Sequence, residues 1–97
     1  MWNYWGRVEV KVDEEWGTVC DNGFDIDDAN VFCRYLGFHK ATGVYPRAVL
    51  GEGSGPVILT KLDCKGDEKS PFDCKHNGFE KTKGCTHKND IGISCTW

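Results

Sequence analysis

The segment EWGTVCDNGFDIDDANVFCRYLGF, from Glu15 to Phe38, decides the fold of this chain. It begins with a predicted strand from Trp16 to Val19, passes through a short acidic turn and continues as one helix over 25–36. Asp25 suits the N-cap of that helix, and Asp28 three residues later can complete a capping box. Gly37 ends the helix, because glycine enters the left-handed conformation at no steric cost. A strand and a helix, each carrying a cysteine, therefore lie at the centre of the fold.

Apolar residues recur along this helix at the three- and four-residue spacing of one face: Ala29, Phe32, Cys33 and Leu36. Such a face predicts packing against a core. The aromatic residues Trp16, Phe24 and Phe72 are expected to join that core. The aromatic residues near the two ends are expected to be exposed: Trp2, Tyr4, Trp5 and Trp97.

The rest of the chain shows strand and turn patterns on both sides of this segment. Valines alternate with charged residues from Gly6 to Val12, as in a half-buried strand, and Asp13-Glu14 forms the turn of a hairpin. The glycine- and proline-containing stretch from Tyr45 to Pro56 predicts a surface loop. Ser70-Pro71 predicts the start of a short helix that ends near Lys75. Two further strands are expected at Val57–Leu59, with Leu62, and at Asp90–Cys95.

Length and composition indicate one small domain that is reinforced by covalent links. The chain has 97 residues, of which 39% are hydrophobic and six are cysteines. A core of this size is modest, and an even cysteine count favours disulfides and therefore an extracellular setting. No Cys-x-x-Cys occurs, which argues against a zinc finger or a thioredoxin-type site. Six cysteines allow many pairings, and the sequence alone does not choose among them.

Several spaced motifs resemble those of one known family, the scavenger receptor cysteine-rich domain. The resemblance covers nearly the whole chain and is specific. The matching motifs are GRVEV (6–10), WGTVC (16–20), the Phe-Asp-x-Asp-Asp-Ala run (24–29), VFCRYLGF (31–38), GEGSGP (51–56), LDCKG (62–66), Asp73-Cys74, HNGF (76–79) and NDIGISC (89–95).

This resemblance implies the cysteine pairing Cys20–Cys85, Cys33–Cys95 and Cys64–Cys74. Trp5 and Phe38 stand where some family members carry two more cysteines, so the chain resembles the six-cysteine group. The implied fold is a small α+β domain, in which a curved, mostly antiparallel sheet cradles one main helix and a short second helix is added. We expect a single domain over 1–97, with its core at about 6–95, excised from a larger extracellular protein.

The resemblance also implies a calcium site. Family members often bind Ca²⁺ through acidic residues at positions that correspond to Asp21, Asn22 and Asn89. Ca²⁺ prefers about six to eight oxygen ligands, and only one of these three residues is a carboxylate. Weak Ca²⁺ binding at this site is therefore expected, and no other cofactor. The alternative is that the acidic residues of this stretch only cap the helix.

Basic residues cluster in the second half of the chain, although the net charge is −3. A basic patch for a polyanionic partner is one interpretation, and solvated loop lysines are the other. Lysine is a poor bidentate ligand for phosphate or sulfate, so such binding would be weak and salt-sensitive. A structural role explains Arg34 as well as ligand binding does. The candidate ligand-binding residues are Arg47, Lys75, Lys81, Lys83 and Lys88.

An enzyme is not predicted. The chain lacks Gly-x-Ser-x-Gly, a phosphate-binding Gly-Lys-Ser/Thr and His-Glu-x-x-His, and its three histidines, His39, His76 and His87, are expected in exposed loops. Two functions remain. The first is a ligand-recognition module of a scavenger receptor or innate-immunity protein, which binds polyanionic surface polymers or proteins. The second is a docking or spacer module of a mosaic secreted or membrane protein, such as a multidomain protease. The fold alone does not separate them.

Overall fold

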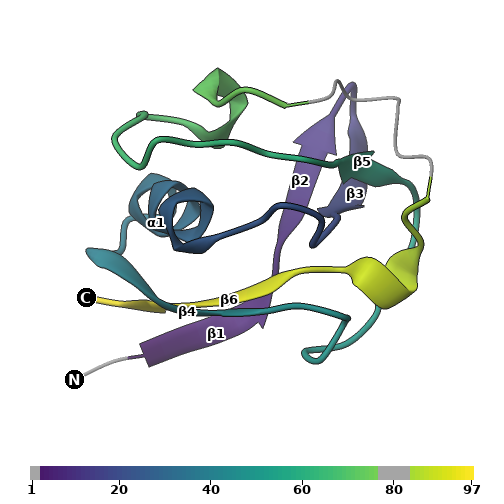
Figure 1. Cartoon of the computed structure of the whole chain (residues 1–97), viewed down its shortest axis with the longest axis horizontal. Helices are drawn as coiled ribbons and strands as arrows, with labels where there is room; N and C mark the ends of the chain where they lie inside the picture. The colour runs from purple at the N-terminus through teal and green to yellow at the C-terminus, as the bar shows by residue number, and fades with distance from the viewer. Residues whose placement is uncertain (1–2, 77–83) are drawn as a thin grey trace.

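A computed structural model describes residues 3–76 and 84–97 of the chain (Figure 1). These residues form six strands, one α-helix and two short 3-10 helices. In chain order the elements are β1 (Asn3–Arg7), β2 (Glu9–Val12), β3 (Glu15–Val19), α1 (Ile26–Tyr35), β4 (Lys40–Tyr45), β5 (Val57–Leu59), the 3-10 helices η1 (Pro71–Asp73) and η2 (His87–Asn89), and β6 (Gly92–Thr96). None of these helices has the length and hydrophobicity needed to span a membrane.

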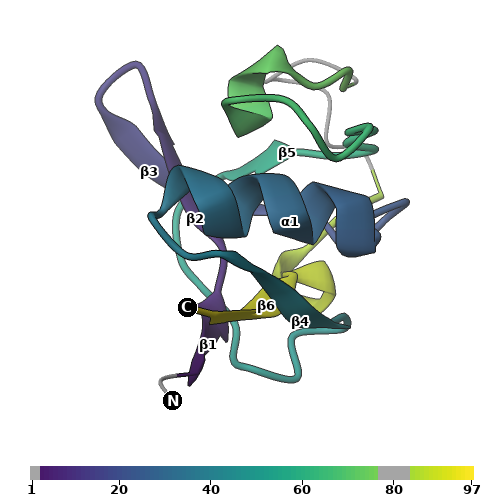
Figure 2. The same cartoon turned by 90° about the vertical axis from the view of Figure 1, so that its left-hand side faces the viewer.

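The α+β prediction is confirmed, and the strands divide between two small sheets. One sheet has the order β1-β6-β4 and is antiparallel, while the other has the order β2-β3-β5. The β2–β3 pair is antiparallel and the β3–β5 pair is parallel. Helix α1 packs on β4 and β6, and Figure 2 shows it between the two groups of strands. The single curved sheet that was predicted to cradle the helix is therefore two separate three-stranded sheets.

The predicted strand from Gly6 to Val12 serves both sheets. It divides at Val8, whose N–H donates to the carbonyl of Ile91 at 2.9 Å. The residues before Val8 pair with β6, and the residues after it pair with β3. Val8 and Val10 are buried, as their alternation with charged residues predicted. One continuous segment thus connects the two sheets through hydrogen bonds.

The helix begins and ends where the sequence indicated. Asp25 is the N-cap, its Oδ1 accepts the N–H of Asp28 at 3.1 Å, and Asp28 Oδ2 accepts the N–H of Asp25 at 2.8 Å. Gly37 follows the C-cap with a φ of +95°. The prediction for Leu36 is wrong, because its side chain is exposed. As the C-cap residue Leu36 has left the helix, so the periodicity of the buried face no longer applies to it.

Trp16 was also predicted wrongly, since its side chain is 59% exposed. The β2–β3 hairpin projects from the rest of the domain (Figure 2). Trp16 pairs with Lys11, one pair away from the pair that adjoins the turn, so it lies near the tip of the hairpin. The predicted turn is present: Asp13 and Glu14 have φ values of +51° and +67°, the combination of the type I′ turns common in hairpins. In β3 burial begins only at Gly17, so the outer residues of the hairpin are solvated.

The other aromatic predictions hold for the described residues. Phe24 and Phe32 are buried, and Phe72 is partly buried against the core. Tyr4, Trp5 and Trp97 are exposed, and Phe38 stacks between Tyr4 and Trp97 with ring-centroid distances of 5.5 and 4.3 Å. Trp2 lies outside the described residues.

The three disulfides are those that the family resemblance implied: Cys20–Cys85, Cys33–Cys95 and Cys64–Cys74. No cysteine is free. The first bridge joins the end of β3 to the segment before η2, and the second joins α1 to β6. The third closes the short loop that leads into η1, where Ser70 caps the 3-10 helix by accepting the N–H of Phe72 at 3.2 Å. The first two bridges attach the strand–helix segment to the C-terminal half.

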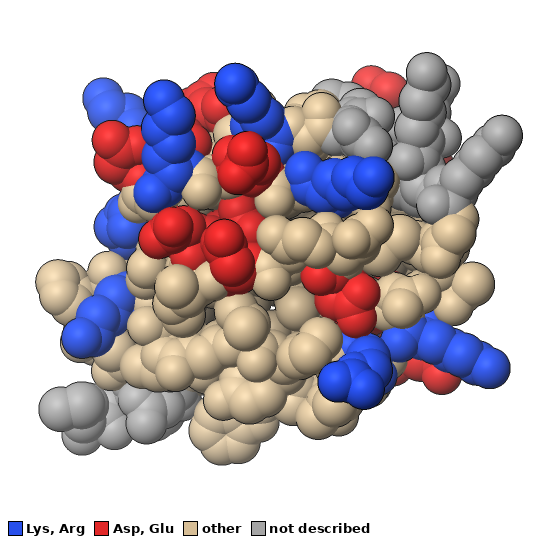
Figure 3. Space-filling model, in the orientation of Figure 1, with Lys and Arg blue, Asp and Glu red and all other residues tan. Residues whose placement is uncertain are grey.

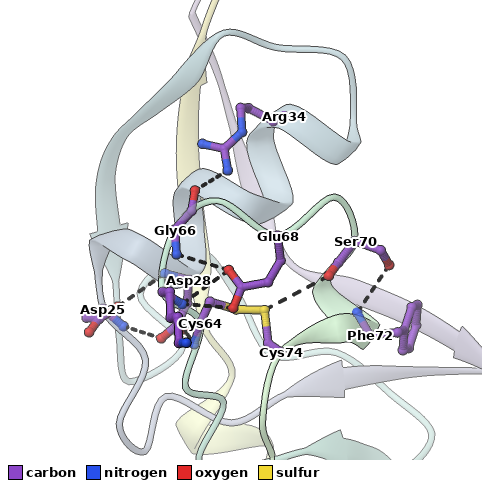
Figure 4. Close-up of a disulfide and its surroundings, with 10 residues drawn as sticks. Asp25, Asp28, Arg34, Cys64, Gly66, Glu68, Ser70, Phe72 and Cys74 are labelled. Carbon is purple, nitrogen blue, oxygen red and sulfur yellow. Dashed lines mark hydrogen bonds between the residues drawn. A yellow bond between two sulfur atoms is a disulfide. The ribbon is translucent and has the colours of Figure 1, made fainter.

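The start of α1 and the third disulfide are joined by Asp28 (Figure 4). Asp28 is only 1% exposed, and its Oδ1 accepts the N–H of Cys64 at 2.7 Å. Arg34, further along the helix, donates to the carbonyl of Gly66. The carboxylate of Glu68 accepts the N–H groups of Lys65 and Gly66, and the Lys65 bond above all holds the pKa of Glu68 below its usual range. The loop around the third disulfide is therefore attached to both ends of α1.

Burial raises the pKa of Asp28 from 3.8 to about 6, although the N–H donors of Cys64 and Asp25 oppose that rise. A folded-state pKa above the unfolded one means that the folded protein binds more protons between about pH 4 and 6. The free energy of unfolding should therefore fall as pH rises through this window, by as much as about 3 kcal/mol from this group.

We predict that Asp28→Asn removes this part of the pH dependence. Asparagine keeps an oxygen for the Cys64 N–H but does not titrate. Urea unfolding at several pH values should give a difference in unfolding free energy, wild type minus variant, that decreases from about pH 4 to 6. The other carboxylates titrate in both proteins and cancel in the difference. A difference that is constant with pH would show that the Asp28 pKa is not raised.

Candidate functional site

Three segments meet at the corner of the molecule that follows the first cysteine. The N–H of Asp21 donates to the carbonyl of Asn89 at 2.7 Å, and Asp21 Oδ2 accepts the N–H of Arg47 at 2.8 Å. The N–H of Ala48 donates to the carbonyl of Asp90 at 3.0 Å. The end of β3, the loop after β4 and the segment before β6 are thereby held together. The Cys20–Cys85 disulfide fixes the same corner covalently.

The structure brings two of the predicted calcium ligands, Asp21 and Asn89, next to each other, and places Asn22 beside them with its side chain exposed. Their oxygens are partly occupied. Asp21 Oδ2 accepts from Arg47, and Asn89 Oδ1 accepts the N–H of Thr86 at 3.2 Å in the capping box of η2. The next carboxylate, that of Asp90, is buried and bonded elsewhere. The available oxygens therefore fit Ca²⁺ poorly.

Asp90 belongs to a cluster that the sequence did not suggest. Its side chain is 1% exposed, and its Oδ2 accepts the N–H of Gly53 at 2.7 Å and lies 2.9 Å from His87 Nδ1. His87 Nε2 lies 2.7 Å from the carbonyl of Gly55. The cluster therefore fastens the glycine-rich loop to the segment that enters β6. His87 was expected to be an exposed loop residue, but its side chain is only 25% exposed.

Both ring nitrogens of His87 face acceptors, so the doubly protonated imidazolium satisfies both. The hydrogen bond to Asp90, followed by that to the Gly55 carbonyl, raises the pKa of His87 above its usual 6.5. The only sequence signal for this arrangement was the three-residue spacing of His87 and Asp90. The Gly53 and Gly55 contacts connect segments more than thirty residues apart, which no local pattern reveals.

Among the described residues, the predicted basic side chains do not form one patch. Arg47 and Lys88 are exposed at the corner, where the Arg47 N–H bonds to Asp21 and Lys88 directly precedes Asn89. Lys75 is exposed on the segment after η1, which Figures 1 and 2 place apart from η2. Lys81 and Lys83 lie outside the described residues. In Figure 3 acidic and basic side chains are intermixed on the visible face, and the area over β4 and β6 is almost free of charge. This face therefore has no field of a single sign.

An apolar groove lies elsewhere, between β1–β2 and α1. Its volume is about 420 Å³. One wall consists of Tyr4 and residues 6–11, and the other is formed by α1 and η1. The exposed large apolar residues that line it are Tyr4, Trp16, Tyr35 and Leu36. Trp16 and Leu36 were predicted to lie in the core, so this surface was not predicted from the sequence.

One group of three potential metal ligands stands close together in the described part of the chain: Cys64, Glu68 and Cys74. The two sulfurs are bonded to each other, and the carboxylate of Glu68 is occupied by backbone N–H groups. The group therefore belongs to the disulfide loop and offers no set of free ligands.

Comparison with known proteins supports the interpretation of the motifs and of the fold. The family model of the scavenger receptor cysteine-rich (SRCR) domain matches residues 3–96. The chain belongs to the SRCR family. It is 50% identical over 91 residues to galectin-3-binding protein of Pongo abelii, covering 94% of this chain and 15% of that protein. It is 47% identical over 90 residues to lysyl oxidase homolog 2 of Homo sapiens, covering 93% of this chain and 11% of that protein.

Two solved SRCR structures are similar to the fold described above. The dimeric form of the SRCR domain of mouse MARCO has a TM-score of 0.90 and 38% identity, covering 99% of this chain and 90% of that one. The third SRCR domain of murine neurotrypsin has a TM-score of 0.82 and 38% identity, covering 96% and 86%. The SRCR fold is a non-catalytic module of the extracellular, ligand-binding type. The chain spans a small fraction of the curated relatives it matches.

We predict that the His87 cluster makes this SRCR domain less stable as pH rises through neutrality. A histidine with a raised folded-state pKa stabilises fully below pH 6.5, and that contribution is lost as pH rises through the folded pKa. His87→Gln can keep hydrogen bonds but does not titrate. Thermal unfolding between about pH 5.5 and 8.5 should show a fall in wild-type stability that the variant lacks. Equal slopes for the two proteins would contradict the prediction.

Proposed function

We propose that this SRCR domain is an extracellular recognition module whose Arg47–Lys88 corner binds anionic groups on surface polymers or proteins. Arg47 has a left-handed backbone with a φ of +59°, and its N–H is held by Asp21. Lys88 belongs to η2, which is connected to Asp21 through Asn89. Two exposed cations thus stand on a backbone that is fixed by hydrogen bonds and a disulfide. The Asp21–Arg47 hydrogen bond is the observation that carries the proposal.

The affinity of one domain should be low. Two exposed charges contribute little in water, and lysine lacks the planar, two-pronged geometry that suits sulfate or phosphate. Useful affinity for a repeating polymer would then come from several linked domains. The large size of the two relatives described above agrees with this arrangement, since the chain spans 15% and 11% of their length.

The same size difference supports the second function, a docking or spacer module within a larger secreted or membrane protein. Such a module would contact a protein partner and would not need a polymer ligand. The apolar groove and its exposed aromatic residues favour this function, because a protein partner can cover them. The first experiment below separates the two functions.

We predict that the domain binds an immobilised sulfated polysaccharide at low salt and is released as salt is raised to physiological strength. The double variant Arg47→Gln/Lys88→Gln should bind about five- to tenfold more weakly. The double variant Lys40→Gln/Lys75→Gln, with the same loss of charge away from the corner, is the matched control. Separate substitution of Lys81 and Lys83 tests the contribution of those two residues. Equal weakening by all variants would indicate attraction by net charge alone, and no binding at low salt would favour the docking function.

Calcium is proposed only as a weak ligand of Asp21, Asn22 and Asn89. Because one carboxylate and two amides offer few free oxygens, we expect a dissociation constant in the millimolar range or above. Isothermal titration with CaCl₂ should therefore give a weak signal that disappears in Asp21→Asn. Polysaccharide binding should be nearly equal in Ca²⁺ and in EDTA. Binding that requires Ca²⁺ would show that these residues form a stronger site than their geometry suggests.

A further inference from the structure

The strand β2 has an unpaired edge. In the described part of the chain it pairs only with β3, since the sheet order is β2-β3-β5. Figure 1 shows β3 on one side of β2 and no strand on the other. The groove is lined by inward-facing Val10 and by outward-facing Glu9 and Lys11 of the same strand. Side chains from both faces of a strand can line the same groove only when the edge of that strand faces the groove. Such an edge is a template for another strand.

The sequence around this edge is self-complementary. From Arg7 to Asp13 it reads Arg-Val-Glu-Val-Lys-Val-Asp, with charges of alternating sign separated by valines. If a second copy pairs antiparallel about a two-fold axis at Val10, Glu9 of each copy lies opposite Lys11 of the other. Val8 then lies opposite Val12. Opposite charges directly across an antiparallel pair are stabilising. The strand therefore carries charges that match a copy of itself.

Neighbouring registers lack this match. A two-fold axis at Glu9 or at Lys11 places two identical charges opposite each other, which is unfavourable. An axis between residues places a valine opposite a charged residue, and so brings an outward-facing position against a buried one. A two-fold axis further along the segment would fall outside β2, at the bend at Val8 or in the Asp13-Glu14 turn. Val10 is thus the one centre within β2 that pairs both of its charged residues favourably.

We propose that two copies of this domain associate through their β2 edges, antiparallel and centred on Val10, to give a symmetric dimer. The hairpin that carries β2 projects from the domain (Figure 2), so its edge is accessible. The exposed side chains of Trp16, Tyr35 and Leu36 line the groove beside that edge and supply apolar surface for the second copy to cover. A two-fold interface of this kind closes on itself and stops at two copies.

The present partners of these charges do not oppose the association. Arg7 contacts Glu9 at 2.7 Å, and Lys11 contacts Glu14 at 3.5 Å, in ion pairs at the surface. Such pairs contribute little to stability, so exchanging them for pairs across the interface costs little. None of these residues belongs to the Arg47–Lys88 corner. The dimer therefore goes beyond the proposed recognition function and does not depend on it.

The proposal is tested by exchanging the charges at Glu9 and Lys11. Dimer formation by the whole chain is measured by sedimentation velocity at low salt, at protein concentrations up to about 1 mM. The wild type should form dimers. Glu9→Lys and Lys11→Glu should each dimerise at least about tenfold more weakly, because each places like charges at both contacts. The two single variants mixed in equal amounts should associate with each other, and the double variant Glu9→Lys/Lys11→Glu should dimerise like the wild type.

Lys40→Glu, which makes the charge change of Lys11→Glu but on β4, is the control and should dimerise normally. Unfolding curves check that each variant is folded, and the mixture and the double variant contain the same substitutions, so their recovery excludes a general folding defect. A wild type that remains monomeric at about 1 mM overturns the proposal. Single variants that dimerise like the wild type, or a mixture that does not associate, also overturn it.

Discussion

The carboxylate of Asp28 is the interaction on which the arrangement of the other parts depends. One oxygen completes the helix cap with Asp25, and the other holds the backbone of Cys64, thirty-six residues along the chain. Because the side chain is buried, neither bond competes strongly with water. The position of α1 is thereby fixed relative to the third disulfide. From the same helix, Cys33 reaches β6 through the second disulfide.

The two sheets gain their connection in a different way. A single extended segment from Asn3 to Val12 pairs with β6 in its first half and with β3 in its second. This use of one segment by two sheets leaves the edge of β2 without a strand partner among the described residues. The unpaired edge, the projecting hairpin and the exposed Trp16 are thus results of the same topology. The groove beside α1 follows from it as well.

The local features could be predicted from the sequence because their causes are local. The capping box, the stop at Gly37, the valine alternation and the hairpin turn each depend on residues a few positions apart. The cysteine pairing came from the family resemblance, since spacing alone left it open. Trp16 and Leu36 were misplaced because their burial depends on how far a hairpin projects and on where a helix ends. The contacts of Asp28 with Cys64 and of His87 with Gly55 join distant segments, and no periodic pattern records them. For the same reason the sequence does not reveal that Arg47 and Lys88 lie at one corner and that Lys75 lies apart from them.

The first and second disulfides also decide how a pulling force would pass through the domain. The two ends of the described chain lie side by side, with Asn3 opposite Thr96 in the β1–β6 pair. Tension applied to them would open this pair one hydrogen bond at a time, which needs little force. The shortest covalent route then runs from the N-terminal strands to Cys20, across to Cys85 and on to Cys95. A parallel route runs from Cys20 along α1 to Cys33 and across the second disulfide to Cys95, so the chain between Cys33 and Cys85 would carry no load. Extension under tension is therefore confined to the segments before Cys20 and after Cys85, and the third disulfide would survive stretching that separates β1 from β6.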